Sequence, residues 1–456
     1  MATTPQANLS AVPALAPERP VIWPRRTVRA LSNGMKVVLV ESHTIPKFDA
    51  QLLIRRGNAA AAQEAPGLAE MTAALVRAGT SSRSLMRIEE DLRRMGADLS
   101  TSAGADTCAI SFSGLTEFSV ELLALAADLA QNASFPEAEF ERERRQRLEE
   151  VKINRTTPGF LTGERIRQVL FGAHPYATLA PTEAQVAAYR REQLVACYRR
   201  HYAPGDALFL AVGAFSADRM MEQIERAFGS WRAPSSAEPE YPALPGICGR
   251  RVHLVHLPGT VQAQVLVGNR AITRHHPDWM PLLLANAVFG GAFNSRLVIN
   301  IREQKGYTYS PRSAVNALRQ HGYFTAAAAV RNDVTAATLT EIFYELDRMR
   351  SLPVPEDELN DTKFYLSGVF SLGLATQDGL AGQLATVYLN NLPEDYLETY
   401  RDKVHALSSD AVPAAARKHF DSANAQIVVV GDRAQLEEQA ALFGPLEIRD
   451  AHGNVL

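Results

Sequence analysis

Residues 290–310 read GGAFNSRLVINIREQKGYTYS, and the rest of the chain is organised around this stretch. Its first glycines end a preceding apolar segment, and Leu297 and Ile301 recur at about one helical turn, so a helix is predicted here. Gly306 then predicts a reversal of the chain, and the aromatic residues after it are typical of a strand that starts at Tyr307. The stretch is therefore predicted to form a helix, a tight turn and a strand.

Two side chains of this stretch have the chemistry of a functional pair. Arg302 lies near the expected end of the helix, and Tyr309 follows seven residues later across the turn, so both side chains can face one cleft. Pattern alone favours a plainer interpretation, in which Arg302 is an exposed helix residue and Tyr309 an ordinary strand residue. The remainder of the chain decides between the two.

The composition is that of a globular protein with more than one domain. The 456 residues are too many for a single hydrophobic core, and 46% of them are apolar against 21% charged. The 47 basic and 50 acidic residues give a net charge of −3, which predicts no nucleic-acid partner. Three widely spaced cysteines, Cys108, Cys197 and Cys248, predict neither a disulfide framework nor a thiolate metal site and are interpreted as small core residues.

The first residues predict an extended arm rather than a targeting segment. Residues 1–25 are rich in alanine and proline, have no basic residue before Arg19 and lack the apolar run of a signal peptide. No later segment has the unbroken apolar length of a membrane span. A cytoplasmic protein is the expectation, and a periplasmic protein whose export signal has been removed is the alternative.

The order of predicted elements in the first half returns in the second half. An Asn33-Gly34 turn predicts a hairpin over 26–41. In each half, strands, an apolar helix closed by glycine, a second helix and two more strands lead to a long helix. A charged helix follows, entered through Pro136 in the first half and through Pro355 in the second. Self-similarity over about two hundred residues indicates duplication of a whole domain.

A segment rich in proline and serine, residues 230–249, separates the halves and is predicted to be a linker. The predicted fold class is α+β, with two homologous domains that each have an antiparallel sheet with helices packed on one face. The predicted organisation is an arm over 1–25, an N-terminal domain over 26–229 and a C-terminal domain over 250–456.

Four segments carry a resemblance that covers nearly the whole chain. They are GLAEMTAALVRAGT from Gly67, AHPYA from Ala173, RRHYAPGDALFLAVG from Arg199 and SRLVINIREQKGYTYS from Ser295. Together with the order of elements, they resemble the pitrilysin and insulinase superfamily of zinc peptidases. The chain is most similar to the short members that are like the mitochondrial processing peptidase.

The resemblance implies a zinc motif that this chain lacks. Active members carry H-x-x-E-H on the helix that begins with G-L-A, where two histidines bind zinc and the glutamate activates water. Here Glu70 and Ala74 stand in place of the histidines, and Ala73 stands in place of the glutamate. Glu150, 76 residues after Ala74, stands at the position of the third ligand. Such a set binds metal weakly at best, so no cofactor is expected in this chain.

Histidines elsewhere in the chain predict no replacement metal site. His253 and His256 would face opposite sides of one strand. His174 and His201 resemble positions that are mainly structural in the superfamily.

By contrast, the opening stretch matches the superfamily. The C-terminal domain of the family supplies an arginine and a tyrosine in the pattern R-E-x-x-G-x-x-Y, which Arg302, Glu303, Gly306 and Tyr309 fit. The resemblance implies that Arg302 and Tyr309 reach the zinc site, bind a substrate carbonyl and stabilise the developing oxyanion. Both are hydrogen-bond donors whose bonds strengthen as negative charge builds on that oxygen. Tyr307 has the same strand parity, but the spacing selects Tyr309.

The chain thus has the donor residues of a peptidase site without its metal ligands. The resemblance implies a non-catalytic subunit of a heterodimeric zinc metallopeptidase, whose homologous partner carries H-x-x-E-H and zinc while this chain lends Arg302 and Tyr309 in trans. Peptides or unfolded polypeptides would bind by adding a strand to a sheet edge. One alternative is a structural or peptide-binding homologue without a peptidase role. Another is an enzyme with an unusual metal site at Glu70 and Glu150.

Overall fold

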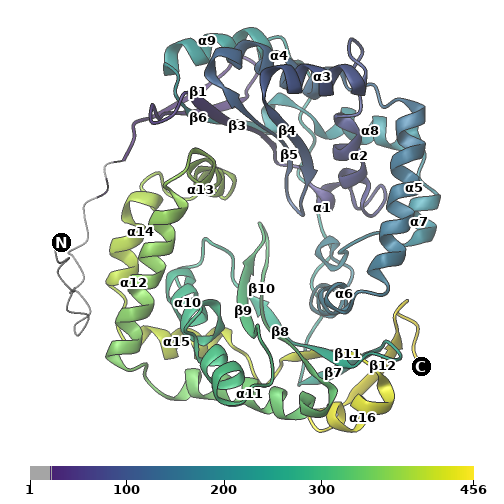
Figure 1. Ribbon diagram of the computed structural model, residues 1–456, viewed down its shortest axis with the longest axis vertical. Helices are drawn as coiled ribbons and strands as arrows, with labels where there is room; N and C mark the ends of the chain where they lie inside the picture. The colour runs from purple at the N-terminus through teal and green to yellow at the C-terminus, as the bar shows by residue number, and fades with distance from the viewer. Residues whose placement is uncertain (1–20, 22) are drawn as a thin grey trace, which may run out of the picture.

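The computed structural model describes residues 21 and 23–456 and contains two six-stranded sheets, one from each half of the chain (Figure 1). The sheets lie at opposite ends of the molecule, and helices cover them and connect them. The arm predicted over 1–25 lies largely outside the described residues. In the described part of the chain, no helix is long and apolar enough to cross a membrane.

The first sheet has the strand order β1-β2-β6-β3-β5-β4. The hairpin predicted at Asn33-Gly34 is present, and Gly34 adopts the positive φ of 89° that its turn requires. β2 pairs with β6 in parallel, and the other neighbours are antiparallel. The strands are β1 (Arg26–Ala30), β2 (Lys36–Glu41), β3 (Lys47–Ile54), β4 (Asp98–Ala103), β5 (Cys108–Leu115) and β6 (Ala207–Gly213).

The second sheet has the order β12-β7-β11-β8-β10-β9. β7 pairs in parallel with both β11 and β12, and the other neighbours are antiparallel. The strands are β7 (Arg251–His256), β8 (Gln262–Ala271), β9 (Arg312–Ala317), β10 (Gly322–Arg331), β11 (Gln426–Gly431) and β12 (Leu446–Asp450).

The predicted duplication and the α+β class are confirmed. The order β2-β6-β3-β5-β4 of the first sheet corresponds to β7-β11-β8-β10-β9 of the second. The antiparallel sheets that the sequence predicts are in fact mixed. The last strand of each repeat returns through helices and therefore pairs in parallel with the first, as long crossovers permit. The outermost strand differs between the sheets, because β1 precedes the first repeat and β12 follows the second.

Three helices of the first half, α2, α4 and α9, pack on one face of the first sheet. Gly67 precedes α2 with a φ of 75°, and a Cβ there would lie 2.8 Å from Pro181 Cδ, so glycine is required where the motif helix starts. The helices are α1 (Asn58–Ala61), α2 (Leu68–Val76), α3 (Leu85–Met95), α4 (Ser119–Asn132), α5 (Glu137–Asn154), α6 (Pro158–Phe171), α7 (Glu183–Ala187), α8 (Arg191–His201) and α9 (Ala217–Phe228).

The second half repeats this arrangement, and its helix α12 begins after Pro355 as α5 begins after Pro136. The α-helices are α10 (Trp279–Asn286), α11 (Thr335–Ser351), α12 (Glu356–Gly373), α13 (Gln377–Leu389), α14 (Tyr396–His405), α15 (Ala411–His419) and α16 (Arg433–Ala441). Two π-helical segments, η4 (Ala287–Gly291) and η5 (Val298–Gln304), lie in or beside the stretch 290–310.

Each sheet is covered on its second face by a helix from the other half of the chain. α13 packs on β6 and β3 of the first sheet, and α6 packs on β11 and β8 of the second. The buried residues follow strand alternation: Val37 and Leu39 face the helices of their own half, whereas Val38 and Val40 face α13. The sequence predicted helices on one face of each sheet, whereas helices cover both faces in the structure.

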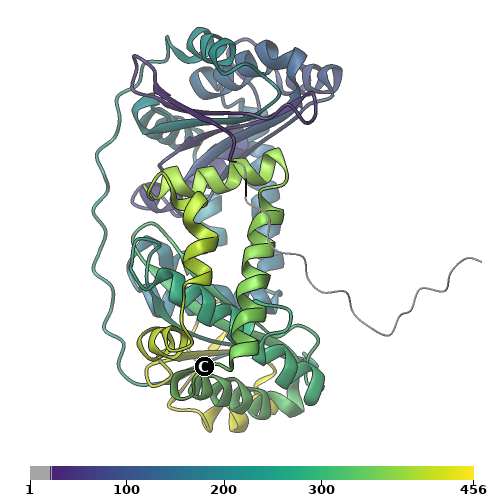
Figure 2. The ribbon, with the colours of Figure 1, turned by 90° about the vertical axis from the view of Figure 1, so that its left-hand side faces the viewer.

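The segment predicted to be a linker has no helix or strand over 231–250. Figure 2 shows it as an extended thread that joins the two halves along one side of the molecule. The boundaries of independent domains at 229 and 250 stay a prediction, because the exchanged helices make each sheet depend on the other half.

Candidate functional site

The positions of the missing zinc motif lie on α2, which packs against α5. Met71 and Ala73 are buried, and Glu70 in the first turn of α2 is about one-third exposed. Glu150 lies on α5 with about half of its side chain exposed. The fold therefore brings Glu70 and Glu150 close together, as expected from their match to ligand positions of the zinc motif.

An arginine lies between these carboxylates. Arg147 on α5 donates from Nη1 to Glu70 Oε1 at 3.0 Å and to Glu150 Oε2 at 3.0 Å, and from Nε to Glu143 Oε1 at 3.1 Å. Glu143, Arg147 and Glu150 share one face of α5, because they are four and three residues apart. A fixed positive charge therefore bridges the two helices that the resemblance associates with zinc.

The surroundings of Arg147 keep it charged. Burial lowers the pKa of its guanidinium, but the charges of Glu70, Glu150 and Glu143 together outweigh this, so that the pKa is raised. Beside it lies a pocket of about 190 Å³ that Glu70, Glu150 and Tyr189 line. Tyr189 closes one wall by donating a hydrogen bond to the carbonyl of Pro66, just before α2.

These residues do not fit a zinc ion. A zinc peptidase needs three protein ligands and a base, whereas Ala73 and Ala74 carry no donor atom. The remaining carboxylates, Glu70 and Glu150, already share the guanidinium of Arg147, which has no lone pair to offer a metal. The alternative of an unusual metal site at Glu70 and Glu150 is therefore not supported by the geometry.

Replacing Arg147 by alanine is expected to leave three carboxylates facing one another. We expect a loss of about 1–3 kcal/mol in the free energy of unfolding, between the values for exposed and buried ion pairs, because Glu150 is half exposed. Manganese ions should restore part of this loss in the variant, because clustered carboxylates bind hard divalent cations. Urea unfolding with and without Mn²⁺ measures both effects.

The matched control is Lys152→Ala on the same helix. Lys152 pairs with Glu149 at 2.7 Å, but both side chains are exposed. Its replacement should leave the urea midpoint nearly unchanged and insensitive to Mn²⁺. Equal losses of unfolding free energy in the two variants would show that Arg147 stabilises the fold no more than an ordinary surface ion pair does.

The second candidate set, Arg302 and Tyr309, is brought together by the stretch 290–310. The centre of the Arg302 guanidinium lies 4.5 Å from the Tyr309 ring centroid and 5.3 Å from that of Phe293. Arg302 also pairs through Nε with Glu303 Oε1 at 3.1 Å. Tyr309 is 78% exposed, so its phenol is open to a ligand.

Anchors on both sides hold this arrangement in place. Buried Arg296 makes a two-pronged ion pair with Glu358 on α12, at 2.8 and 2.7 Å. Asn300 within η5 donates to Glu345 on α11 at 2.9 Å. After the turn, Thr308 donates to the carbonyl of Ala329 on β10. The π-helical form of η5 is rare in proteins and is frequent at functional sites.

The structure corrects one part of the sequence prediction for this stretch. The strand expected from Tyr307 begins only at Arg312, and residues 306–311 are irregular, with bends at Tyr307 and Tyr309. Tyr307 and Tyr309 therefore do not share a strand face. Tyr307 packs against the hydrophobic core of the second half of the chain, whereas Tyr309 faces solvent. The choice of Tyr309 over Tyr307 as a ligand-facing residue stays a prediction, and this difference in exposure favours it.

Two residues of these sites were not identified from the sequence. Arg147 could have been found from its spacing to Glu143 and Glu150, which is that of helical ion pairs. Phe293 could have been noticed as a large aromatic residue two positions after the pair Gly290-Gly291, at a place where no hydrophobic periodicity predicts its burial. Among the described residues, no hydrogen bond or ion pair joins the Arg147 cluster to Arg302 or Tyr309.

Comparisons with known proteins agree with this architecture. Residues 36–176 match the family model described as Insulinase (Peptidase family M16), and residues 188–366 match the model described as Peptidase M16 inactive domain. The uncharacterized zinc protease YmxG of Bacillus subtilis is 22% identical over 393 residues, which cover 85% of this chain and 94% of the relative.

Two solved structures are similar over most of the chain. The peptidase M16 inactive domain from Pseudomonas fluorescens has a TM-score of 0.84 and 26% identity, over 90% of this chain and 98% of that chain. A protease from Helicobacter pylori has a TM-score of 0.83 over 90% of this chain and 100% of that chain, and at 20% identity this likeness shows the fold alone. With both halves matched by family models and the zinc positions lost on α2, the chain belongs to the pitrilysin/insulinase superfamily as a member that lacks the zinc motif.

Proposed function

We propose that this chain is a non-catalytic subunit of a heterodimeric zinc metallopeptidase. It supplies Arg302 and Tyr309 to a substrate carbonyl at the zinc site of a homologous partner. The observation that carries the proposal is the 4.5 Å contact between the Arg302 guanidinium and the Tyr309 ring. Two donors to one oxyanion must lie side by side, and this contact keeps them so on an otherwise exposed loop.

The terminal guanidinium nitrogens of Arg302 are free to donate hydrogen bonds to a substrate carbonyl. In the described part of the chain its Nε pairs with Glu303, while its terminal nitrogens have no hydrogen-bond partner. Contacts with the rings of Phe293 and Tyr309 restrict the guanidinium, so less side-chain entropy is lost when a carbonyl binds. A donor that is already oriented acts more strongly on the transition state than one that must reorganise.

The other half of the reaction has to come from outside this chain. Arg147 fills the space between Glu70 and Glu150, and Ala73 cannot act as a base. A partner with an intact motif would bring zinc and the activated water. The substrates we propose are peptides or unfolded polypeptides, and the compartment we propose is the cytoplasm.

The experiment that tests this proposal is a reconstitution. Peptide hydrolysis is measured for this chain alone, for a zinc-motif partner alone and for their mixture, with a fluorogenic peptide. The proposal requires a mixture that is faster than the partner alone and a chain that is inactive by itself. A mixture no faster than the partner alone would show that this chain lends nothing to catalysis.

The alternative, a peptide-binding homologue without a peptidase role, is favoured by one specific observation. Phe293 and Tyr309 are 67% and 78% exposed on either side of Arg302, an arrangement that can hold a peptide without any chemistry. In that case the labelled peptide would bind to this chain alone, Arg302→Ala would weaken this binding, and no mixture would accelerate hydrolysis.

Phe293→Ala tests whether the ring positions Arg302. We expect kcat of the mixture to fall about two- to thirtyfold, the equivalent of one cation–π contact, with the pH profile unchanged. Phe364→Ala is the matched control, because Phe364 is a half-exposed aromatic residue on α12. If both variants have the activity of the wild type, the Phe293 ring does not orient Arg302.

A further inference from the structure

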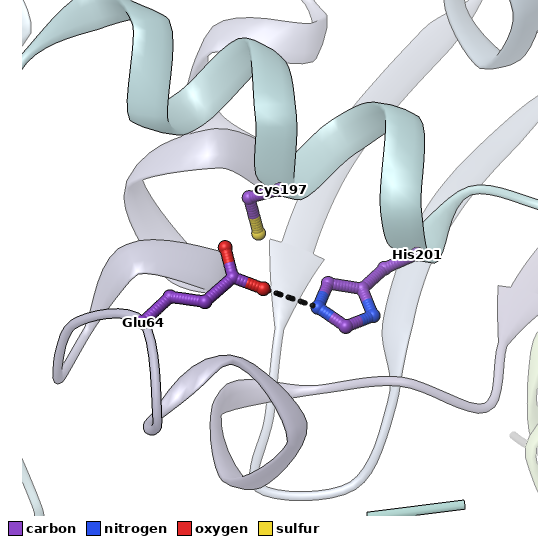
Figure 3. Close-up of side chains that lie close together, drawn as sticks. All are labelled: Glu64, Cys197 and His201. Atoms are coloured by element: carbon purple, nitrogen blue, oxygen red, sulfur yellow. Dashed lines mark hydrogen bonds and ion pairs between the residues drawn. The ribbon is translucent and has the colours of Figure 1, made fainter. Parts of the chain in front are cut away.

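A cluster of metal-binding side chains that the sequence did not reveal lies where α2 and α8 pack together. Glu64 is in the turn that precedes α2, and Cys197 and His201 are one helical turn apart on α8. Figure 3 shows the three side chains converging, with Glu64 Oε1 3.2 Å from His201 Nε2. One ligand atom from each residue lies within 4.8 Å of the others.

We propose that Glu64, Cys197 and His201 are the protein ligands of a zinc ion. The site is distinct from the degenerate motif, because Glu64 and His201 line a pocket of about 380 Å³ that does not include Glu70 or Arg147. The proposal is independent of the heterodimer, since it concerns neither Arg302 nor a partner chain.

The donor set selects the type of metal. A carboxylate oxygen, a thiolate sulfur and an imidazole nitrogen are all ligands of zinc, with bonds of about 2.0–2.3 Å. A tetrahedron with such bonds separates its ligand atoms by roughly 3.3–3.8 Å, so the Glu64–His201 distance of 3.2 Å is already close. Calcium and magnesium are disfavoured, because they require oxygen ligands. A fourth position remains for water from the adjoining pocket.

Burial makes the cluster more than a surface ion pair. The exposed fractions of Cys197 and His201 are 1% and 6%. Within the described chain, His201 Nδ1 is buried and has no hydrogen-bond partner. Nε2 lies 3.2 Å from Glu64 Oε1, so Nε2 is the ring nitrogen placed to bind a metal beside this carboxylate.

Zinc binding requires a proton to leave. A cysteine thiol is ordinarily protonated at neutral pH, whereas zinc binds the thiolate. On binding, the S–H bond breaks, a Zn–S bond forms and one proton is released to solvent, with no oxidation or reduction. The bound ion would clamp the last turn of α8 to the turn that leads into α2.

Arg200 competes with the metal for Glu64. Its Nη1 lies 2.7 Å from Glu64 Oε1, and the plain alternative is that Arg200 and a protonated His201 simply pair with this carboxylate. The Arg200 side chain is 58% exposed, so it can leave the carboxylate at little cost. Removing Arg200 should therefore strengthen metal binding, whereas a simple ion-pair cluster would bind no metal in either form.

The experiment uses the full chain, stripped of metal and titrated with Co²⁺ under reducing conditions. We expect one equivalent to bind, with the near-ultraviolet charge-transfer band of a cobalt–thiolate bond and the visible bands of a tetrahedral site. Zinc should displace the cobalt. Arg200→Ala should tighten binding several-fold. A wild-type chain without the thiolate band would overturn the proposal.

Variants identify the ligands. Cys197→Ser should abolish the thiolate band, and Cys248→Ser, a change at the exposed cysteine, should leave it intact. Glu70→Gln should also leave it intact, which separates this site from the degenerate motif. If Cys197→Ser lacks the native circular dichroism spectrum, His201→Gln is the variant that tests the site. His201→Gln should weaken Co²⁺ binding at least tenfold while the thiolate remains. An unchanged Co²⁺ affinity would overturn the proposal that His201 is a ligand.

Discussion

In the reconstituted mixture, Arg302→Ala is expected to lower kcat about 10²–10³-fold, the effect of removing one oxyanion donor. The guanidinium is charged at every working pH and lies against the Tyr309 ring, so its loss removes the stronger of the two donors. KM should change far less than kcat, because the hydrogen bond strengthens only as the carbonyl oxygen becomes negative. Steady-state kinetics on the mixture measures both constants.

Tyr309→Phe should have a smaller effect in the same direction, because it removes one neutral hydroxyl and keeps the ring under Arg302. Arg331→Ala is the matched control, because Arg331 is an exposed arginine of the same half that pairs with the nearby Asp333. The trans-donor role is wrong if Arg302→Ala and Arg331→Ala give the same kcat. It is equally wrong if Arg302→Ala raises KM alone, since uniform binding would then be all that was lost.

Much of the fold follows from local sequence signals. The Asn33-Gly34 turn, the proline entries into α5 and α12, and the repeated order of strands and helices are all present where the sequence predicts them. The helices α6 and α13 are not predicted. Both contain internal glycines, which lower helix propensity, and their apolar faces are explained only by a sheet from the distant half of the chain.

The candidate sites show the same division between local and long-range information. The resemblance to the family pattern R-E-x-x-G-x-x-Y selects Arg302 and Tyr309, and the structure brings them into contact. The strand expected from Tyr307 is absent up to Arg312, because the backbone N–H of Tyr307 donates to the carbonyl of Ile301 in η5. The Thr308 hydroxyl donates to the carbonyl of Ala329 on β10. The convergence of Glu64 with Cys197 was not visible either, because it depends on the packing of α2 against α8.

Leu384→Ala is expected to lower the free energy of unfolding by about 2–5 kcal/mol. Leu384 is 1% exposed on α13 and packs in one cluster with Val38, Leu208 and Leu210 of the first sheet. The substitution removes buried apolar surface and leaves a cavity at the contact between the two halves of the chain. Leu372→Ala on α12 is the matched control, because Leu372 is 74% exposed and should change stability by less than about 0.5 kcal/mol.

Because α6 and α13 each pack on the sheet of the other half, Leu384→Ala is also expected to affect the unfolding of both halves. Trp231 is buried in the first core and Trp279 in the second half, so single-tryptophan chains report on each half separately. Because each sheet needs a helix from the other half, Leu384→Ala should move both urea midpoints together, although the sheet on which α13 packs is the first one. If the Trp231 midpoint falls and the Trp279 midpoint does not, the halves unfold independently, and the division predicted at residues 230–249 separates true folding domains.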